Sequence, residues 1–239
     1  MYPENGTSPV DLTCFDTPEC VLDVVYNPAR TALILQAEAL HIPHASGLSM
    51  LVAQAKKACE YFADTEIPDT EIDRIERLLS HQMQNIVLIG MPGSGKSSIG
   101  RALAERLHRP FIDADAEIVR RAGCSIPEIF TKDGEPGFRK FESAVLADLG
   151  KASGSILATG GGCITRPENY PSLHQNGRIV WLMRPLELLP TDGRPMSQAN
   201  PLEALWETRK ALYERFSDVR IANDRTIADC VHAIEEALL

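Results

Sequence analysis

The residues with the clearest chemical meaning form a glycine-rich loop at positions 90–97. The loop fits the pattern G-x-x-x-x-G-K-[ST] that is typical of phosphate-binding loops. Its sequence is Gly90-Met91-Pro92-Gly93-Ser94-Gly95-Lys96-Ser97. An apolar run at 85–89 precedes the loop and a helical pattern at 98–107 follows it, which is the order that such a loop requires. The segment is therefore predicted to bind ATP or GTP, and these flanking elements disfavour the alternative of a chance glycine-rich turn.

Each part of this loop has a physical task in holding a nucleotide. The glycines let the backbone N–H groups at 93–95 converge on phosphate oxygens, and the helix that starts near Ser98 adds a favourable dipole. Lys96 is expected to reach the β- and γ-phosphates, and the Ser97 hydroxyl is expected to bind Mg²⁺. ATP and Mg²⁺ are the predicted cofactors.

Two aspartates, Asp113 and Asp115, come at the end of the next expected strand, at 110–113. Ligands of parallel sheets bind at the carboxyl ends of the strands, so both carboxylates are expected at the site. One could orient the metal while the other holds an acceptor hydroxyl and accepts its proton. The alternative is that either residue caps the helix beginning near Ala116, and the residue types alone leave both roles open.

Three consecutive glycines, Gly160, Gly161 and Gly162, follow the third expected strand. Each glycine costs chain entropy, so three in a row indicate the close approach of a ligand or of backbone, with a flexible turn as the alternative. Arg139 and Glu142 lie three residues apart on an expected helix and can form a pair. Such a pair would mean little by itself, because surface pairs of this kind are common and weak.

Strand and helix patterns alternate through the last two thirds of the chain. Short apolar runs predict strands at 85–89, 110–113, 155–159, 178–183 and 219–222. This alternation is typical of a doubly wound parallel sheet with helices on both faces. We predict an α/β fold of the P-loop NTPase type for residues 85–239, preceded by a small, mainly helical segment.

Residues 85–239 resemble shikimate kinase, because six elements of that family occur in order. They are the loop at 90–97, the Asp113/Asp115 pair, G-E-x-x-F-R-x-x-E at 134–142, the triple glycine, Arg194-Pro195 in a lid position, and Arg209 before Leu212-Tyr213. The resemblance implies Mg²⁺-dependent transfer of the γ-phosphoryl group of ATP to the 3-hydroxyl of shikimate.

The resemblance also implies a role for each residue on the acceptor side. Asp115 would hold the acceptor hydroxyl and serve as the base, and Asp113 would orient the metal. Arg139 and Arg209 would clamp the carboxylate of shikimate, a task suited to their planar donor groups. The triple glycine would supply a backbone contact to the substrate.

On the nucleotide side, Arg194 is implied to close over the transferring phosphate together with Lys96. Only ten positions separate Arg194 from Arg184, which is short for a lid of this family, and Arg184 and Asn223 are candidates for the adenine contact. Two alternatives remain: another small-molecule kinase with the same loop, such as a gluconate kinase, or an ATP-binding interaction module without turnover. The two arginines of the acceptor side and the triple glycine favour shikimate.

Residues 1–62 resemble the carboxyl-terminal portion of shikimate dehydrogenase. The resemblance is carried by D-V-V-Y-N-P at 23–28 and G-L-S-M-L-V-A-Q at 47–54. In that family the positions of Tyr26 and Gln54 lie at the substrate. The segment has no glycine fingerprint for a dinucleotide, so we expect no dehydrogenase activity from this chain by itself.

A strand at 21–28 and apolar helices at 30–40 and from 47 onward are expected before a helical linker at 63–84. These few elements cannot bury their apolar faces alone. The apolar face of the second helix is a stripe formed by Leu51, Ala55, Ala58 and Phe62. Docking onto the kinase, self-association, partial disorder and a native chain that starts further upstream are all open.

The composition restricts the partners and the cellular compartment expected for the protein. The 239 residues carry a net charge of −9, and residues 1–84 hold most of it with 13 acidic and 5 basic side chains. The sequence shows no basic patch with interleaved aromatic residues, which argues against nucleic acid, and no apolar run of the roughly 18 residues that span a membrane. The six scattered cysteines form no C-x-x-C pair, which predicts a reducing cytoplasm.

Overall fold

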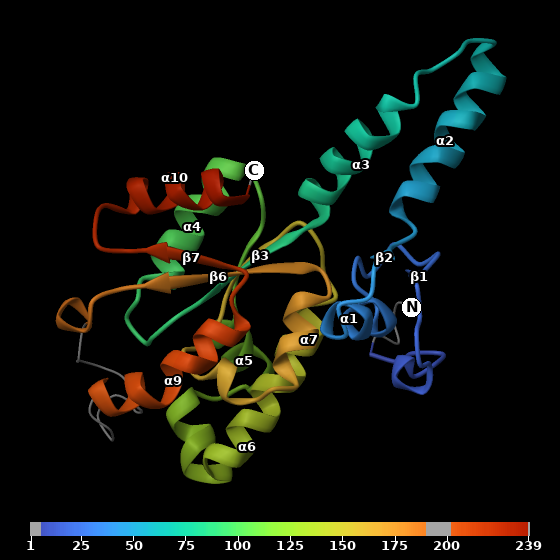
Figure 1. Cartoon of the computed structure of the whole chain (residues 1–239). Helices are drawn as coiled ribbons and strands as arrows, with labels where there is room; N and C mark the ends of the chain where they lie inside the picture. Colours follow the sequence, from blue (N-terminus) through green and yellow to red (C-terminus); the bar gives the residue numbers. More distant parts are fainter. Residues whose placement is uncertain (1–5, 190–201, 239) are drawn as a thin grey trace. The chain divides into compact units, whose positions relative to one another are not determined.

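The computed structural model describes residues 6–189 and 202–238, which are divided between two compact units (Figure 1). The first unit comprises Met1–Gln84 with His174–Asn176, and the second comprises Asn85–Leu173 with Gly177–Leu239. Among the described residues, no helix combines the length and the apolar character needed to cross a membrane.

The first unit consists of short strands and helices around a small apolar core. Its elements are a 3₁₀ turn at Leu12–Cys14, β1 (Val21–Leu22), α1 (Ala32–Ala39), β2 (His44–Ala45), α2 (Leu48–Ala63) and α3 (Thr70–Met83). β1 and β2 pair in parallel. The core residues are Leu12, Val21, Ile34 and Ala37.

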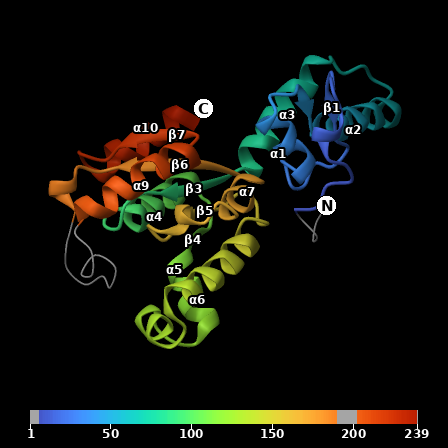
Figure 2. The same cartoon turned by 60° about the horizontal axis from the view of Figure 1, so that its bottom comes forward.

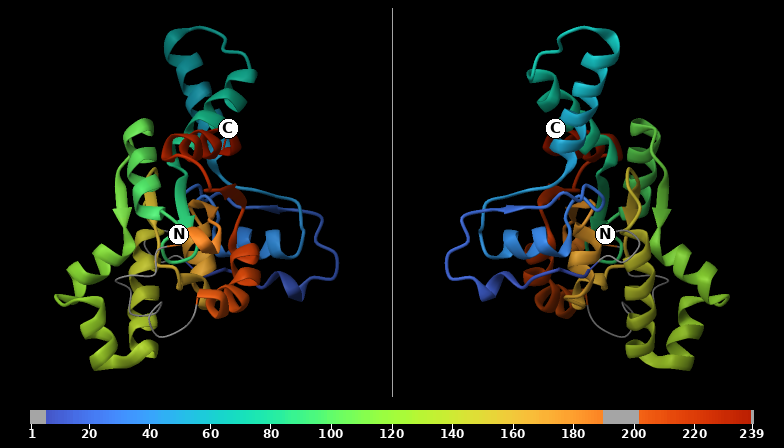
Figure 3. Two further views of the ribbon diagram at one scale, coloured as in Figure 1. Left: turned by 90° about the vertical axis from the view of Figure 1, so that its left-hand side faces the viewer. Right: turned by 90° about the vertical axis from the view of Figure 1, so that its right-hand side faces the viewer.

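The stretch 63–84, expected as a helical linker, is largely occupied by α3, which folds back along α2 as a helical hairpin (Figure 3). Lys56 of α2 binds Asp69, just before α3, at 2.7 Å and Glu60 at 3.0 Å. The apolar stripe of α2 is exposed: Leu51 is 37% and Phe62 is 93% exposed. The hairpin therefore leaves that stripe facing solvent.

A five-stranded parallel sheet forms the centre of the second unit. Its strands are β3 (Asn85–Ile89), β4 (Phe111–Asp113), β5 (Ile156–Ala158), β6 (Gly177–Met183) and β7 (Val219–Ala222). They lie in the order β4-β5-β3-β6-β7. The central strand β3 is buried along its whole length, as the near-continuous apolar run at 85–89 predicts for a parallel sheet.

Helices cover both faces of this sheet (Figure 2). They are α4 (Lys96–Leu107), α5 (Ala114–Ala122), α6 (Ile126–Leu149), α7 (Asn169–His174), α9 (Leu202–Phe216) and α10 (Ile227–Leu238), with 3₁₀ turns at Cys163–Thr165 and Leu186–Leu188. Successive strand residues face opposite sides, so Leu88 packs with α4 and α10 while Val87 packs with α7 and α9. The predicted fold class, a parallel sheet between two helical layers, is confirmed.

Gly100 allows α4 to lie close to the sheet. A Cβ atom at this position would be 2.5 Å from Phe111 Cε2 and 3.2 Å from Leu88 Cδ1. Glycine costs a helix about 1 kcal/mol relative to alanine. The lack of a side chain here therefore follows from packing against the sheet, and not from helix propensity.

Replacing Gly100 by alanine should destabilise the protein even though alanine favours helices. Overpacking a core costs about 1–3 kcal/mol, which exceeds the propensity gain of about 1 kcal/mol. Urea unfolding followed by circular dichroism should show a lower midpoint for Gly100→Ala. Glu105→Ala, at an exposed position of the same helix, is the control and should stay within about 0.5 kcal/mol of the wild type. A higher midpoint for Gly100→Ala would contradict the packing argument.

Candidate active site

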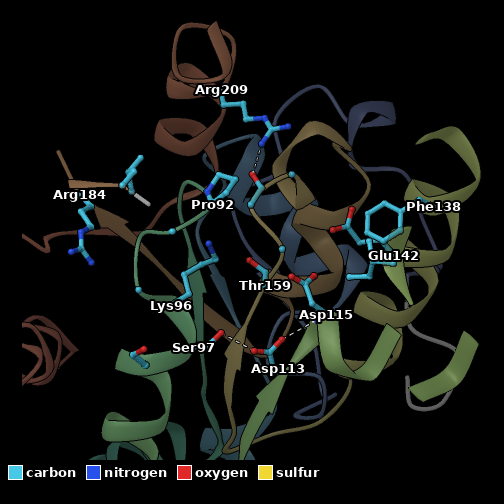
Figure 4. Close-up of a pocket in the computed structure, with 18 of the residues that line it drawn as sticks. Pro92, Lys96, Ser97, Asp113, Asp115, Phe138, Glu142, Thr159, Arg184 and Arg209 are labelled. Carbon is cyan, nitrogen blue, oxygen red and sulfur yellow. Dashed lines mark hydrogen bonds between the residues drawn. The ribbon is translucent and has the colours of Figure 1, made fainter. Parts of the chain in front are cut away.

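The carboxyl ends of β3, β4 and β5 open onto a cavity of about 880 Å³ within the second unit (Figure 4). Loops that follow these strands line it, together with side chains from α6 and α9. The predicted residues that line the cavity are Gly93, Gly95, Lys96, Ser97, Ser98, Asp113, Asp115, Arg139, Gly160, Gly161, Gly162 and Arg209. The fold thus brings separate stretches of sequence together at the edge of the sheet where ligands of such folds bind.

Glycines with positive φ angles shape the loop between β3 and α4. Gly90, Gly93 and Gly95 have φ angles of 149°, 87° and 89°, a region that other residues adopt only with strain. Gly90 is also crowded, because a Cβ there would be 2.7 Å from the carbonyl oxygen of Leu182. The loop turns the N-terminus of α4 onto the cavity, and that helix end attracts anions.

Lys96 lies inside the curve of this loop and is only 9% exposed. Its ammonium group donates hydrogen bonds to the carbonyl oxygens of Gly90 and Met91, at 2.9 and 3.0 Å. These contacts compensate the burial of its charge and hold the ammonium group beside the N-terminus of α4. A phosphate bound at this helix end would therefore meet a positive charge that is already in place.

Asn223, which follows β7, supports the same loop from outside the cavity. Its amide nitrogen donates to the carbonyl oxygen of Ser94 at 2.7 Å, and both residues are buried. Asn223 does not line the cavity, whereas Arg184, the other candidate for the adenine contact, does. Arg194, predicted as the lid arginine, lies outside the described residues.

Asp113 caps a helix, one of the roles that the sequence leaves open, and it also contacts the phosphate-binding loop. Its Oδ1 accepts hydrogen bonds from the backbone N–H groups of Asp115 and Ala116, at 3.1 and 3.3 Å, and so caps α5. Its Oδ2 accepts a bond from the Ser97 hydroxyl at 2.7 Å. The helix cap thereby fixes a carboxylate next to the hydroxyl that was predicted to bind a metal.

Arg139 and Glu142 form a buried ion pair on α6, beyond the kink that Gly134 introduces into this helix. Arg139 Nη1 lies 2.7 Å from Glu142 Oε2, and the two residues are 6% and 1% exposed. Burial raises the pKa of Glu142 despite the nearby guanidinium groups. Burial opposes the charge of Arg139, but the carboxylates of Glu142 and Glu135 outweigh it and raise the pKa of Arg139.

Each glycine of the triple-glycine loop makes room for a different neighbour. A Cβ on Gly160 would be 2.8 Å from Glu142 Oε1 and 2.9 Å from Asp115 Oδ1. A Cβ on Gly161 would be 2.8 Å from the ring of Pro92, and one on Gly162 would overlap the guanidinium group of Arg139. The close approach predicted from the three glycines is thus an approach of backbone to the side chains of the site.

Arg209 reaches the same loop from α9 and is 5% exposed. Its Nη1 donates to the carbonyl oxygen of Gly161 at 3.2 Å (Figure 4). Arg139 lies against Gly162 of the same loop, on a different helix. Two cationic side chains from distant parts of the chain therefore lie beside one loop and line one cavity.

Some residues of the site were not predicted from the sequence. Thr159 lines the cavity between the loops, and its hydroxyl donates to the carbonyl oxygen of Leu88 at 2.9 Å. Phe130 and Phe138 form an apolar wall, with their rings stacked at 4.6 Å. The position of Thr159 at the end of a strand and next to the glycines was an available signal, whereas the aromatic wall depends on how α6 folds.

A phosphate-binding loop beside a small pocket with buried arginines defines an ATP-dependent kinase of small molecules. The family model described as "Shikimate kinase" matches residues 92–238. The chain therefore belongs to the shikimate kinase family, whose members use ATP as the phosphoryl donor.

Curated relatives and solved structures agree with this assignment. A shikimate kinase of Synechococcus sp. is 43% identical over 65% of this chain and 84% of the relative. One of Pseudomonas putida is 44% identical over 59% of this chain and 88% of the relative. The solved shikimate kinase of Acinetobacter baumannii, in complex with shikimate, has a TM-score of 0.61 at 36% identity and covers 67% of this chain and 96% of its own. That of Aquifex aeolicus has a TM-score of 0.57 at 34% identity, over 65% of this chain and 96% of its own.

Glu142→Gln should change the way thermal stability depends on pH. Burial raises the pKa of Glu142 above its ordinary value of 4.5, so the folded state binds this proton more tightly than the unfolded state does. Below pH 4.5 the contribution of this group to the free energy of unfolding of the wild type is fully present. It is lost as the pH rises through the folded-state pKa, because the buried carboxyl group must then ionise. Because glutamine does not ionise, the melting temperature of the variant minus that of the wild type should become more positive as the pH rises above about 4.5.

Glu135→Gln is the control for this measurement, because Glu135 also pairs with Arg139 but its side chain is 51% exposed. A pH dependence of the same size in both variants would mean that the loss of a partner of Arg139, and not the burial of Glu142, is responsible. A flat difference for Glu142→Gln would mean that Arg139 fully compensates the burial of the carboxylate.

Proposed function

We propose that the protein transfers the γ-phosphoryl group of ATP to the 3-hydroxyl of shikimate, giving shikimate 3-phosphate and ADP. The observation that carries the proposal is the meeting of the phosphate-binding loop, Asp115 and two buried arginines around one cavity. Shikimate carries a carboxylate and vicinal hydroxyls, so it needs both cationic and acidic groups in a small space. The matched family and the relatives named above support the same reaction.

The acceptor side follows from the charges around the triple glycine. Arg139 and Arg209 would bind the shikimate carboxylate, because planar guanidinium groups match carboxylates in geometry and charge. Asp115, half-buried next to Gly160, would hold the acceptor hydroxyl and accept its proton. Glu142 balances part of the charge of Arg139, and Arg209 supplies the second positive charge.

The donor side follows from the loop at 90–97. Lys96 and the N-terminus of α4 would hold the phosphates of ATP. Ser97 Oγ and Asp113 Oδ2, 2.7 Å apart, are hard oxygen donors that fit Mg²⁺, which when bound would neutralise phosphate charge. In the described ranges no three His, Cys, Asp or Glu residues gather as metal ligands, in keeping with an ion that takes its other ligands from water and phosphate. Arg194 would close over the transferring phosphate, as the resemblance implies.

ADP release from Mg-ATP by the 239-residue chain should depend on shikimate. Arg139→Ala should abolish most of this stimulation while ATP binding, measured by calorimetry, survives. Removing one partner of a buried charge pair costs about 2–5 kcal/mol, so kcat/KM for shikimate should fall by about two to three orders of magnitude.

Arg120→Ala is the matched control, since this arginine lies on the neighbouring α5 with its side chain 71% exposed. It should leave the kinetics unchanged. Wild-type kinetics in the Arg139→Ala variant would remove Arg139 from the carboxylate site, and shikimate-independent ADP release by the wild type would contradict the proposed reaction.

We further propose that residues 1–62 are a dehydrogenase-like fragment that mediates self-association in a cytoplasmic enzyme. The exposed stripe of α2 supports this, because its residue sizes are symmetric along the helix: Leu51, Ala55, Ala58 and Phe62. In an antiparallel pair of two copies Leu51 would meet Phe62 and Ala55 would meet Ala58, as a two-fold interface requires. The small central residues would allow the helices to approach closely, and the large outer residues would be buried.

Light scattering coupled to size exclusion should therefore show a dimer of the full chain. Leu51→Ser and Phe62→Ser should each shift the protein towards the monomer, because each removes a large apolar contact from the stripe. Tyr61→Ser is the control, since Tyr61 is 80% exposed on the same helix turn but lies off the stripe. A wild type that stays monomeric at about 100 μM would contradict self-association. Its dissociation constant would then exceed about 100 μM, which is weaker than is usual for a specific interface.

A further inference from the structure

The carbonyl oxygen of Gly161 accepts two hydrogen bonds from α9. One comes from Arg209 Nη1 at 3.2 Å, and the other comes from the hydroxyl of Tyr213 at 2.5 Å. Arg209 and Tyr213 are four residues apart and so lie on the same face of the helix. The oxygen therefore joins the triple-glycine loop, the arginine and the phenol at a single point.

The Tyr213 hydroxyl is held in place by the core of the second unit. Tyr213 is completely buried, and its ring stacks on Trp181 of β6 with centroids 5.6 Å apart and planes 17° from parallel. A ring wedged between the sheet and its own helix has one accessible orientation, so its hydroxyl points where the packing directs it. Burial also raises the pKa of Tyr213, and the hydroxyl remains a hydrogen-bond donor at any working pH.

Holding this carbonyl sets the orientation of a whole peptide group in the loop. In a trans peptide the N–H points opposite to the C=O. With the Gly161 carbonyl directed at α9, the N–H of Gly162 is directed to the other side of the loop. Gly162 lines the cavity and lies against the Arg139 guanidinium group. A rotation of this peptide would therefore change the loop on the face that the substrate meets.

We infer that Tyr213 is a positioning residue for the acceptor: its hydroxyl fixes the Gly161 carbonyl and, through that shared oxygen, the guanidinium group of Arg209. Tyr213 itself does not line the cavity, so it acts on the ligand only through these two groups. The inference rests on the proposed function, in which Arg209 binds the carboxylate of shikimate. It assigns to this tyrosine a contribution to acceptor affinity that is separate from its contribution to the core.

Tyr213→Phe tests the inference, because it removes one oxygen atom and keeps the stacked ring. Loss of a buried hydrogen bond to a positioned group should raise the KM and the calorimetric Kd for shikimate about three- to tenfold. The KM for ATP should change less than about twofold, since the phosphate-binding loop is untouched. An unchanged affinity for shikimate would overturn the inference.

Ser155→Ala is the matched control for a role in stability alone. The Ser155 hydroxyl is also buried and donates to Asn85 Oδ1 at 2.8 Å, but it lies at the amino end of β5, away from the cavity. It should lower the melting temperature by a similar amount without changing the KM for shikimate. If both variants raise this KM equally, Tyr213 acts only through the stability of the fold and the positioning role is wrong.

A double-mutant cycle identifies the group through which Tyr213 acts. Arg209→Lys keeps a positive charge, so that residual binding of shikimate stays measurable, but it loses the planar donor pair. The loss caused by Tyr213→Phe should be clearly smaller in the Arg209→Lys background than in the wild type, because the two share one acceptor. Equal losses in both backgrounds would separate Tyr213 from Arg209 and overturn the inference.

Wild-type calorimetry distinguishes failure of this inference from failure of the proposed function. A wild type that binds ATP but not shikimate would overturn both. A wild type that binds and phosphorylates shikimate, together with a Tyr213→Phe variant of unchanged affinity, would overturn the inference alone.

Discussion

The close packing of side chains against the backbone at 160–162 is the constraint on which the site depends. Gly160 leaves space for the carboxylates of Asp115 and Glu142, Gly161 for Pro92, and Gly162 for the guanidinium group of Arg139. A side chain at any of the three positions would push one of these groups away from the cavity. The three glycines lose more conformational entropy on folding than other residues would. Their lack of side chains allows acidic and basic groups to converge within one small space.

The charges around this loop are arranged so that burial does not neutralise the site. Arg139 is compensated by Glu142, whose own burial is unfavourable enough to raise its pKa. Arg209 instead donates to a carbonyl oxygen, which satisfies a hydrogen bond without cancelling its charge. Lys96 also donates hydrogen bonds to two carbonyl oxygens. Three buried cationic side chains are thus accommodated at the cavity with acceptors for their donor groups.

Sequence patterns were sufficient for the elements and for the residue types at strand ends, because both depend on local signals. The alternation of apolar runs with helical segments predicted five strands close to where they lie, and the loop at 90–97 carries its own signature. The role of Tyr213 and the burial of Glu142 could not be read in this way, since each depends on packing between segments distant in sequence. For Asp113 the sequence could not show that one carboxylate oxygen caps α5 while the other accepts a hydrogen bond from Ser97.

The order of the strands explains why the triple glycine lies at the centre of the site. In the order β4-β5-β3-β6-β7, strand β5 lies between β4 and β3, although it follows both in sequence. The loop after β5 is therefore placed between the carboxyl end of β4, where Asp113 and Asp115 lie, and the phosphate-binding loop, which follows β3. Phosphoryl transfer requires donor and acceptor to meet in line. A loop without side chains at this central position leaves room for Asp115, Glu142, Pro92 and Arg139 beside the cavity, and the position of β5 between β3 and β4 puts the loop there.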